Sequence, residues 1–238
     1  MSLVQRIARQ GKITFSAHYS ALTAGSTEAP DLQPLLALVN ELKSSDINLP
    51  SNPAVADITP PDSAPAAFID ILRDNHFTIA GFLLRRGSSM PIHDHPNMYG
   101  ICKVLYGKVI ITSFSPPKRI ETSIPHSHGF SYYMAKDEGA EFFTAASPCA
   151  ILTPNSKNLH TICAMEHSAF FDILGPPYNS FENRNCHYYQ EVPKTTVFDQ
   201  EKAKELDGVR VLKRTEQPPM FYTSVKSYRG PPVDVRKL

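Results

Sequence analysis

From residue 76 onward, the chain consists of short runs rich in β-branched and aromatic residues, which glycine and proline interrupt. Seven runs are typical of β-strands and follow one another at roughly ten-residue spacing: 76–85, 101–114, 129–134, 150–153, 160–164, 169–174 and 187–192. Proline accounts for 21 of the 238 residues and tryptophan is absent, which also favours strands and turns over a helical bundle. We therefore expect a mainly β protein, folded as a sandwich or a barrel.

The N-terminal third is typical of helices, and proline marks where it ends. Leucines and Val39 recur at helical spacing over 32–43, with Asp31 placed to cap the helix and Pro34 in its first turn. Residues 48–67 contain five prolines, which indicates an extended linker. We predict a single domain with a helical segment at 1–47, the linker at 48–67, a barrel core at 68–192, and C-terminal strands and a tail at 193–238, including a strand at 209–213.

The opening residues have two interpretations. No Asp or Glu precedes Glu28, while Arg6, Arg9 and Lys12 accompany apolar residues at helical spacing. This composition can belong to a mitochondrial transit peptide. An amphipathic first helix that docks on the domain explains the same pattern, and we favour it.

Charge and cysteine content argue against several classes of protein. Lys and Arg total 24 against 23 for Asp and Glu, whereas proteins that bind nucleic acids or membrane surfaces normally carry a basic excess. No apolar run approaches the roughly 18 residues of a membrane span. Four irregularly spaced cysteines do not make a disulfide scaffold. We expect a cytoplasmic protein with no nucleic-acid or membrane partner.

Nine histidines include two His-x-His pairs. In the first pair, His93 and His95 share one face if the segment is a strand, so both imidazoles can reach one metal ion. By itself the pair is weak support, because a polar strand end explains it as well. The rival pair, His126 and His128, lies in a polar, proline-flanked segment, which we interpret as a surface loop.

The surroundings of the first pair resemble a known motif. Five residues separate Gly87 from the pair, and Gly107 follows the next strand-like run. This spacing is similar to the first half of the motif of the cupin superfamily, whose members are double-stranded β-helix barrels of the jelly-roll kind. The common cupin pattern adds a glutamate ligand four or five residues after the pair, where this chain has Tyr99 and Gly100. No carboxylate ligand is therefore expected there.

The second half of the cupin motif is a proline-led turn and a strand that supplies another histidine. Residues 151–160 match it, with Pro154 in the turn. The resemblance therefore implies three metal ligands, His93, His95 and His160.

Several longer strings resemble one family within this superfamily, the cysteamine (2-aminoethanethiol) dioxygenases and plant cysteine oxidases. The match begins at Leu3-Val-Gln-Arg-Ile-Ala-Arg-Gln10, which also favours the first helix over the transit peptide. It continues in order through these strings: Ile92-His-Asp-His-Pro96, Lys103-Val-Leu-Tyr-Gly107, Leu152-Thr-Pro154, Asn158-Leu-His160, Phe171-Asp-Ile-Leu174, Pro176-Pro-Tyr178 and Cys186-His-Tyr-Tyr189. The stretch between Phe114 and Phe143 matches poorly.

The resemblance implies a non-haem iron(II) thiol dioxygenase that adds both atoms of O₂ to a thiol. The substrate would be cysteamine, giving hypotaurine, or the N-terminal cysteine of a protein, giving a Cys-sulfinate. In the second role such enzymes mark proteins for degradation and act as oxygen sensors. His93, His95 and His160 would hold Fe²⁺, and the resemblance favours a monomer.

Four further residues match family positions near the site. Asp172 and Tyr178 would position the substrate amine or the bound oxygen, and a carboxylate such as Asp172 is a suitable acceptor for an ammonium group. A turn-capping role for Asp172 and a packing role for Tyr178 stay open. Cys186 and Tyr188 match a pair that forms a thioether crosslink in some members, and i, i+2 spacing on a strand would permit it. Two ordinary strand residues are the alternative.

Two other functions stay open. A three-histidine cupin acting on a small carboxylated thiol such as free cysteine would place an arginine against the carboxylate, and Arg85 and Arg86 are near in sequence. A cupin that has lost catalysis would serve as a binding module. The remaining cysteines, Cys102, Cys149 and Cys163, lie in apolar runs and are expected to be buried and inert.

Overall fold

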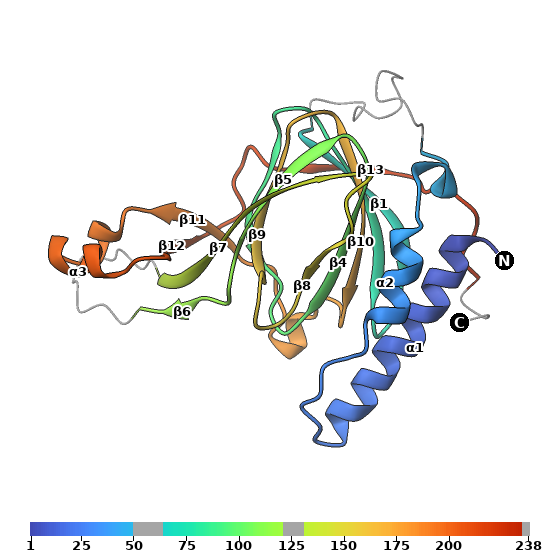
Figure 1. Cartoon of the computed structure of the whole chain (residues 1–238), viewed down its shortest axis with the longest axis horizontal. Coiled ribbons are helices and arrows are strands. Elements are labelled where there is room, and N and C mark those ends of the chain that lie inside the picture. Colours follow the sequence, from blue (N-terminus) through green and yellow to red (C-terminus); the bar gives the residue numbers. More distant parts are fainter. Residues whose placement is uncertain (50–63, 121–130, 235–238) are drawn as a thin grey trace.

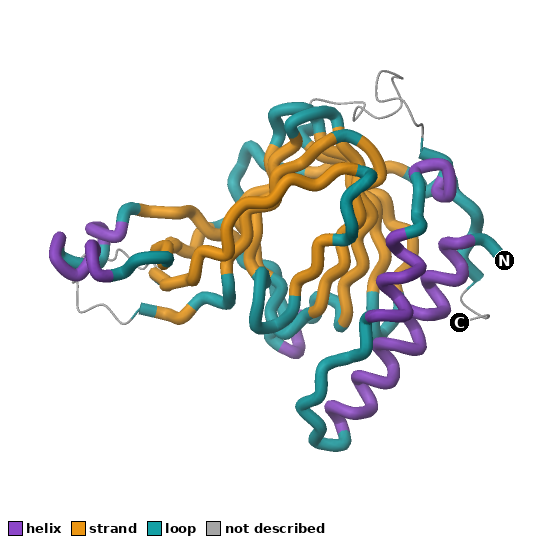
Figure 2. Tube along the Cα trace, viewed as in Figure 1, coloured by secondary structure: helices purple, strands orange, loops and turns teal. Residues whose placement is uncertain are grey.

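The computed structural model describes residues 1–49, 64–120 and 131–234, and two β-sheets form its body (Figure 1, Figure 2). The first sheet has the strand order β13-β1-β2-β10-β4-β8. Its strands are β1 (Ala66–Arg73), β2 (Thr78–Leu84), β4 (Tyr99–Tyr106), β8 (Ala150–Leu152), β10 (Ser168–Gly175) and β13 (Thr223–Lys226). The second has the order β12-β11-β3-β9-β5-β7-β6. Its strands are β3 (Ser89–Asp94), β5 (Lys108–Phe114), β6 (Lys118–Arg119), β7 (Tyr132–Thr144), β9 (Leu159–Ala164), β11 (Tyr188–Val192) and β12 (Val209–Thr215).

The order of the central strands identifies the fold. Along the chain, β2, β4, β8 and β10 belong to the first sheet, and β3, β5, β7 and β9 to the second. The chain therefore crosses between sheets at almost every connection, and the two central sets, β2-β10-β4-β8 and β3-β9-β5-β7, enclose an interior. This is the double-stranded β-helix, or jelly roll, of the cupins. The predicted fold class is confirmed.

Two helices cover the outer face of the first sheet (Figure 1). α1 (Leu3–Thr23) and α2 (Gln33–Asn40) bury their apolar residues in one cluster with Phe77, Ile79 and Phe171. The opening residues thus form a first helix packed on the barrel, as we favoured. The remaining helical turns are η1 (Ser44–Ile47), η2 (Ser180–Glu182), η3 (Lys194–Thr196) and α3 (Gln200–Glu205). In the described ranges, no helix is both long enough and apolar enough to cross a membrane.

Side-chain alternation separates this outer cluster from a second one inside the barrel. On β10, Phe171 packs against the helices, whereas Phe170 joins the interior cluster with Val104, Ile111 and Ile162. Both faces of the first sheet are therefore apolar at β4 and β10, which explains why residues 101–106 and 169–174 carry apolar side chains at most positions instead of alternating with polar ones. The interior cluster fills only part of the barrel, because a cavity described below occupies the rest.

Two expectations about strands need correction. β1 begins at Ala66, within the predicted linker 48–67, and sequence analysis did not identify it. β7 extends from Tyr132 to Thr144, well past the predicted 129–134 run. The C-terminal segment returns to the barrel, since β13 pairs in parallel with β1. Much of the linker, residues 50–63, and the segment 121–130 lie outside the described residues, so the domain boundaries stay a prediction.

Gly107 marks a corner between sheets. The sequence suggests a tight reversal at Tyr106-Gly107, but β4 and β5 pair with other strands and belong to different sheets. Gly107 has a φ of +76°, and a Cβ there would lie 2.3 Å from the carbonyl oxygen of His167. Only glycine allows the chain to cross at this point.

Replacing Gly11 with alanine should destabilise the protein, against the usual helix preference. In an exposed helix the change would stabilise by about 1 kcal/mol. Here the new Cβ would lie 2.7 Å from Cε2 of the buried Phe77, and such overpacking costs about 1–3 kcal/mol. We expect a net loss, with a melting temperature about 2–4 °C lower. Ser20→Ala, on the exposed side of the same helix, is the control; a Gly11→Ala protein as stable as the wild type would contradict the packing described.

Candidate metal centre

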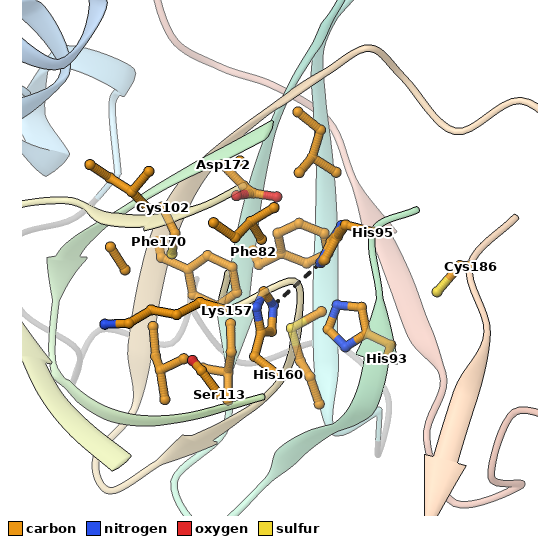
Figure 3. A pocket seen from close by; sticks show the side chains of 18 of the residues that line it. Phe82, His93, His95, Cys102, Ser113, Lys157, His160, Phe170, Asp172 and Cys186 are labelled. Atoms are coloured by element: carbon orange, nitrogen blue, oxygen red, sulfur yellow. Dashed lines mark hydrogen bonds between the residues drawn. The ribbon is translucent and has the colours of Figure 1, made fainter. Parts of the chain in front are cut away.

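Three histidines meet inside the barrel (Figure 3). His93 on β3 lies directly opposite His160 on β9, and His95 follows one residue beyond the end of β3. Their ring centroids are 4.7–4.9 Å apart, and one ring nitrogen from each lies within 4.8 Å of the others. The structure thus brings together the three residues that the sequence predicts as ligands.

A β-bulge turns His93 into the interior. The register between β3 and β9 shifts between Met90 and His93, and both residues line the same cavity. Without the shift, strand alternation would place them on opposite faces. Asn158 fixes the backbone beyond the strand, since its Nδ2 donates to the carbonyl oxygen of His95 over 2.7 Å. The bulge and this hydrogen bond aim both histidines of the pair at one point.

Hydrogen bonds to Nδ1 leave Nε2 free on these rings. His93 Nδ1 lies 2.9 Å from the carbonyl oxygen of Pro91, which can only accept, so Nδ1 carries the proton. Tyr178 Oη donates to the carbonyl oxygen of Asp94 over 2.8 Å and therefore accepts from His95 Nδ1, also at 2.8 Å. The backbone of Lys157 hydrogen-bonds His160. The Nε2 atoms of His95 and His160 then face each other at 3.4 Å.

Burial keeps these imidazoles neutral. It lowers the pKa of His93, and it lowers the pKa of His95 and His160 well below the usual value, with the neighbouring histidines adding to the effect. The ring nitrogens that face one another carry lone pairs and no protons, so a cation between them would be favourable. Neutral imidazoles bind divalent transition metals such as iron. The donor set thus fits a metal ion held by three nitrogens.

Asp94, between the two histidines of the pair, ties the site to β11. Its buried carboxylate accepts from the His187 backbone N–H at 2.7 Å, from His187 Nδ1 at 2.9 Å and from Tyr189 Oη at 2.9 Å. β11 pairs with β3 so that Tyr188 lies opposite His93. No role for Asp94 was predicted. Its position between the two candidate ligands is nevertheless a signal for such a supporting role, because alternation along the strand turns its side chain away from them.

Cys186 lies between two tyrosines. Its thiol hydrogen-bonds the hydroxyls of Tyr178 and Tyr188. Burial raises the pKa of Cys186 to about 11 and that of Tyr188 to about 12, so both keep their protons at neutral pH. Cys186 precedes β11 rather than lying on it, so the shared strand face expected for the pair is wrong, although the two side chains still meet. Cys186 is a free cysteine here.

Asp172 faces the same cavity from the opposite sheet (Figure 3). It lies within β10, two residues after the inward-facing Phe170, so it caps no turn. Burial raises the pKa of Asp172 to about 7. Cys102 lies opposite it on β4 and also lines the cavity. The expected burial is confirmed for Cys149 and is wrong for Cys102 and Cys163, which are half-buried. The cavity therefore offers an acidic group for which the described protein residues supply no countercharge.

The cavity has a volume of about 300 Å³. The three histidines, Asp172, Tyr178, Cys186 and Tyr188 all line it, together with aromatic rings such as Phe82, Phe143 and Phe170. This volume lies at the lower end of the range for small-molecule sites. The arrangement suits a small ligand that carries one group for the metal and one cation for the carboxylate.

The sequence offers two other candidates, Arg85 and the rival histidine pair. Arg85 donates through Nε to the carbonyl oxygen of Ala64, and among the described residues no arginine lines the cavity. The rival pair, His126 and His128, belongs to 121–130 and lies outside the described residues. Its interpretation as a surface loop stays a prediction.

Comparisons with known proteins find similar chains. The family model described as PCO_ADO matches residues 38–233. The chain is 33% identical to 2-aminoethanethiol dioxygenase of Homo sapiens, over 98% of this chain and 97% of that protein, and 27% identical to plant cysteine oxidase 1 of Arabidopsis thaliana, over 85% and 72%. A solved protein with a double-stranded β-helix domain from Klebsiella pneumoniae is 14% identical, with a TM-score of 0.37 over 54% of this chain and 88% of its own. By the family model and the human relative, the chain belongs to the family of 2-aminoethanethiol dioxygenases and plant cysteine oxidases, and it is an enzyme of the dioxygenase type.

Proposed function

We propose that this protein is an iron(II)-dependent dioxygenase of aminothiols. Its substrate would be cysteamine, the N-terminal cysteine of a protein, or both, and its product a sulfinic acid. The observation that carries the proposal is one small cavity with three neutral histidines on one wall and the carboxyl group of Asp172 on another. An aminothiol carries a thiol, which suits the histidine wall, and an ammonium group, which suits the carboxyl wall.

The reaction balances without an external reductant. A thiol RSH and O₂ give RSO₂H, and the sulfur atom supplies all four electrons. When bound, ferrous iron would supply a dipositive charge that favours the thiolate form of the substrate, together with one-electron chemistry toward dioxygen. His93, His95 and His160 would hold it, and because they add no negative charge they leave that dipositive charge for the thiolate to offset.

The other residues of the cavity would position the substrate. Asp172 would accept hydrogen bonds from the ammonium group. Tyr178 would hold the His95 ring through Nδ1, as residues behind a metal ligand commonly do. We also propose that Cys186 and Tyr188 are part of the active site and can form the thioether crosslink, with loss of the thiol hydrogen and one ring hydrogen to O₂ as oxidant. Their contact supports this proposal.

The two other functions have less support. A carboxylated thiol would need a cation that is free to meet its carboxylate, and no described arginine lines the cavity. A silent binding module would not need three neutral, convergent histidines. The four free cysteines suit the reducing cytoplasm that we propose as its location, and oxygen sensing through protein N-termini would follow from the second substrate class.

His160→Ala should abolish iron binding. Removing one of three nitrogen ligands leaves too few donors at the site, so we expect the iron content, measured by elemental analysis after anaerobic loading, to fall from about one per chain to close to zero. His126→Ala, which changes the rival pair, should keep its iron. The reverse pattern would move the metal site to that pair.

The iron-loaded protein should add 32 Da to an aminothiol. We expect this gain, measured by mass spectrometry, with cysteamine or with a peptide that begins with cysteine, and a comparison at equal concentration ranks the two. A peptide whose N-terminal cysteine is acetylated is the control, because it lacks the ammonium group for Asp172. Absence of product from both unmodified substrates would refute the proposal.

Asp172→Asn should raise the KM for cysteamine about 10–100-fold, because a hydrogen bond to a charged group contributes about 1.5–3 kcal/mol. The wild-type KM should fall as the pH rises from 6 to 8, since the carboxyl becomes a carboxylate as the pH passes its pKa of about 7. The substrate thiol also ionises in this direction, so the variant supplies the baseline. Equal pH profiles in the two proteins would exclude Asp172 as the ammonium acceptor.

A further inference from the structure

An ion pair lies at the rim of the active-site cavity. Glu141 on β7 and Lys157, in the turn between β8 and β9, both line the cavity, and their carboxylate and ammonium groups are in contact. The two side chains are 52% and 36% exposed, so the pair faces solvent. The pair therefore lies where the cavity meets solvent.

The chain fixes the position of Lys157. Its backbone has a φ of +54° and hydrogen-bonds His160, so the residue lies next to a proposed metal ligand. In Figure 3 its side chain runs along the cavity wall and its amine points away from the histidines. The ammonium group of Lys157 therefore lies at the rim of the cavity, where it is paired with the carboxylate of Glu141.

The charges of the cavity follow from its lining. Its described acidic residues are Asp172 and Glu141, its one described lysine is Lys157, and the histidines are neutral. With both acids ionised and no metal ion counted, the described lining carries a net charge of −1. When an aminothiol has its thiol at the histidines and its ammonium at Asp172, the Glu141–Lys157 pair is the other charged part of the described lining that a further substituent can meet. A carboxylate there would meet a lysine already neutralised and a glutamate that repels it.

We propose that the Glu141–Lys157 pair determines specificity, so that the enzyme favours aminothiols with a neutral group, a hydrogen or an amide, over those with a carboxylate next to the amine. This inference rests on the proposed function. It assigns the selection to the pairing itself, because the same lysine without Glu141 would attract the carboxylate. Glu141 therefore neutralises Lys157, so that a substrate with a carboxylate finds no free ammonium group to pair with.

The test compares L-cysteine with L-cysteinamide, which differ only in the charge of this substituent. For each protein we take the ratio of kcat/KM for cysteinamide to that for cysteine. In Glu141→Gln, Lys157 is free and the ratio should fall about fivefold, the size expected for one exposed charge interaction. In the double variant Glu141→Gln/Lys157→Met the fall should be lost, and 0.5 M salt should weaken it by screening.

Glu138→Gln is the matched control, because it removes the same charge from the same strand outside the cavity. Its ratio should equal that of the wild type. If Glu141→Gln also leaves the ratio unchanged while cysteinamide is oxidised, the specificity proposal is wrong and the proposed function stands. If the wild type oxidises none of cysteamine, cysteinamide and cysteine, the proposed function itself fails.

Discussion

The antiparallel pairing of β3 with β9 is the contact on which the site depends. Its register places His93 opposite His160, residues far apart in the sequence, and the bulge after Met90 turns His93 inward. A slip of one residue would send one of the two histidines to the other face of the sheet. Asn158 and Asp94 then secure both sides of this ladder, the first by holding the backbone of His95 and the second by holding the segment that begins β11. The sheet thus places His93 and His160, and the third candidate ligand, His95, follows directly after one of its strands.

Burial of the three imidazoles costs free energy unless each polar nitrogen finds a partner. The structure gives acceptors to the outer nitrogens, the carbonyl oxygen of Pro91 for His93 and the hydroxyl of Tyr178 for His95. The Nε2 atoms of His95 and His160 face each other instead, at a separation of 3.4 Å. A bound cation would satisfy them at once. The same low polarity raises the pKa of Asp172 to about 7. Without substrate, this carboxyl group is therefore partly protonated at neutral pH. A bound ammonium group would favour its ionised form.

Local patterns predicted the parts of the fold that depend on local chemistry. Runs of β-branched and aromatic residues identified most strands, and the i, i+2 spacing made His93 and His95 candidates that the family resemblance then supported. His160 needed the family resemblance, because no local signal says which strand will pair with β3. The hairpin predicted at Gly107 was wrong for the same reason. The same local sequence suits a tight turn within a hairpin and a corner where the chain crosses between sheets. β1 was missed because its start follows a proline-rich stretch, and the Glu141–Lys157 pair joins two elements whose contact exists only in the folded barrel.

The most direct test of the centre is the number of protons that iron displaces. Anaerobic calorimetry at pH 6.5, in two buffers with different ionisation enthalpies, gives this number. Three histidines of ordinary pKa would be half protonated and would release about 1.5 protons per iron. Buried imidazoles that are already neutral should release close to none while binding one iron per chain. Release of one proton or more would contradict the preformed, neutral three-histidine site.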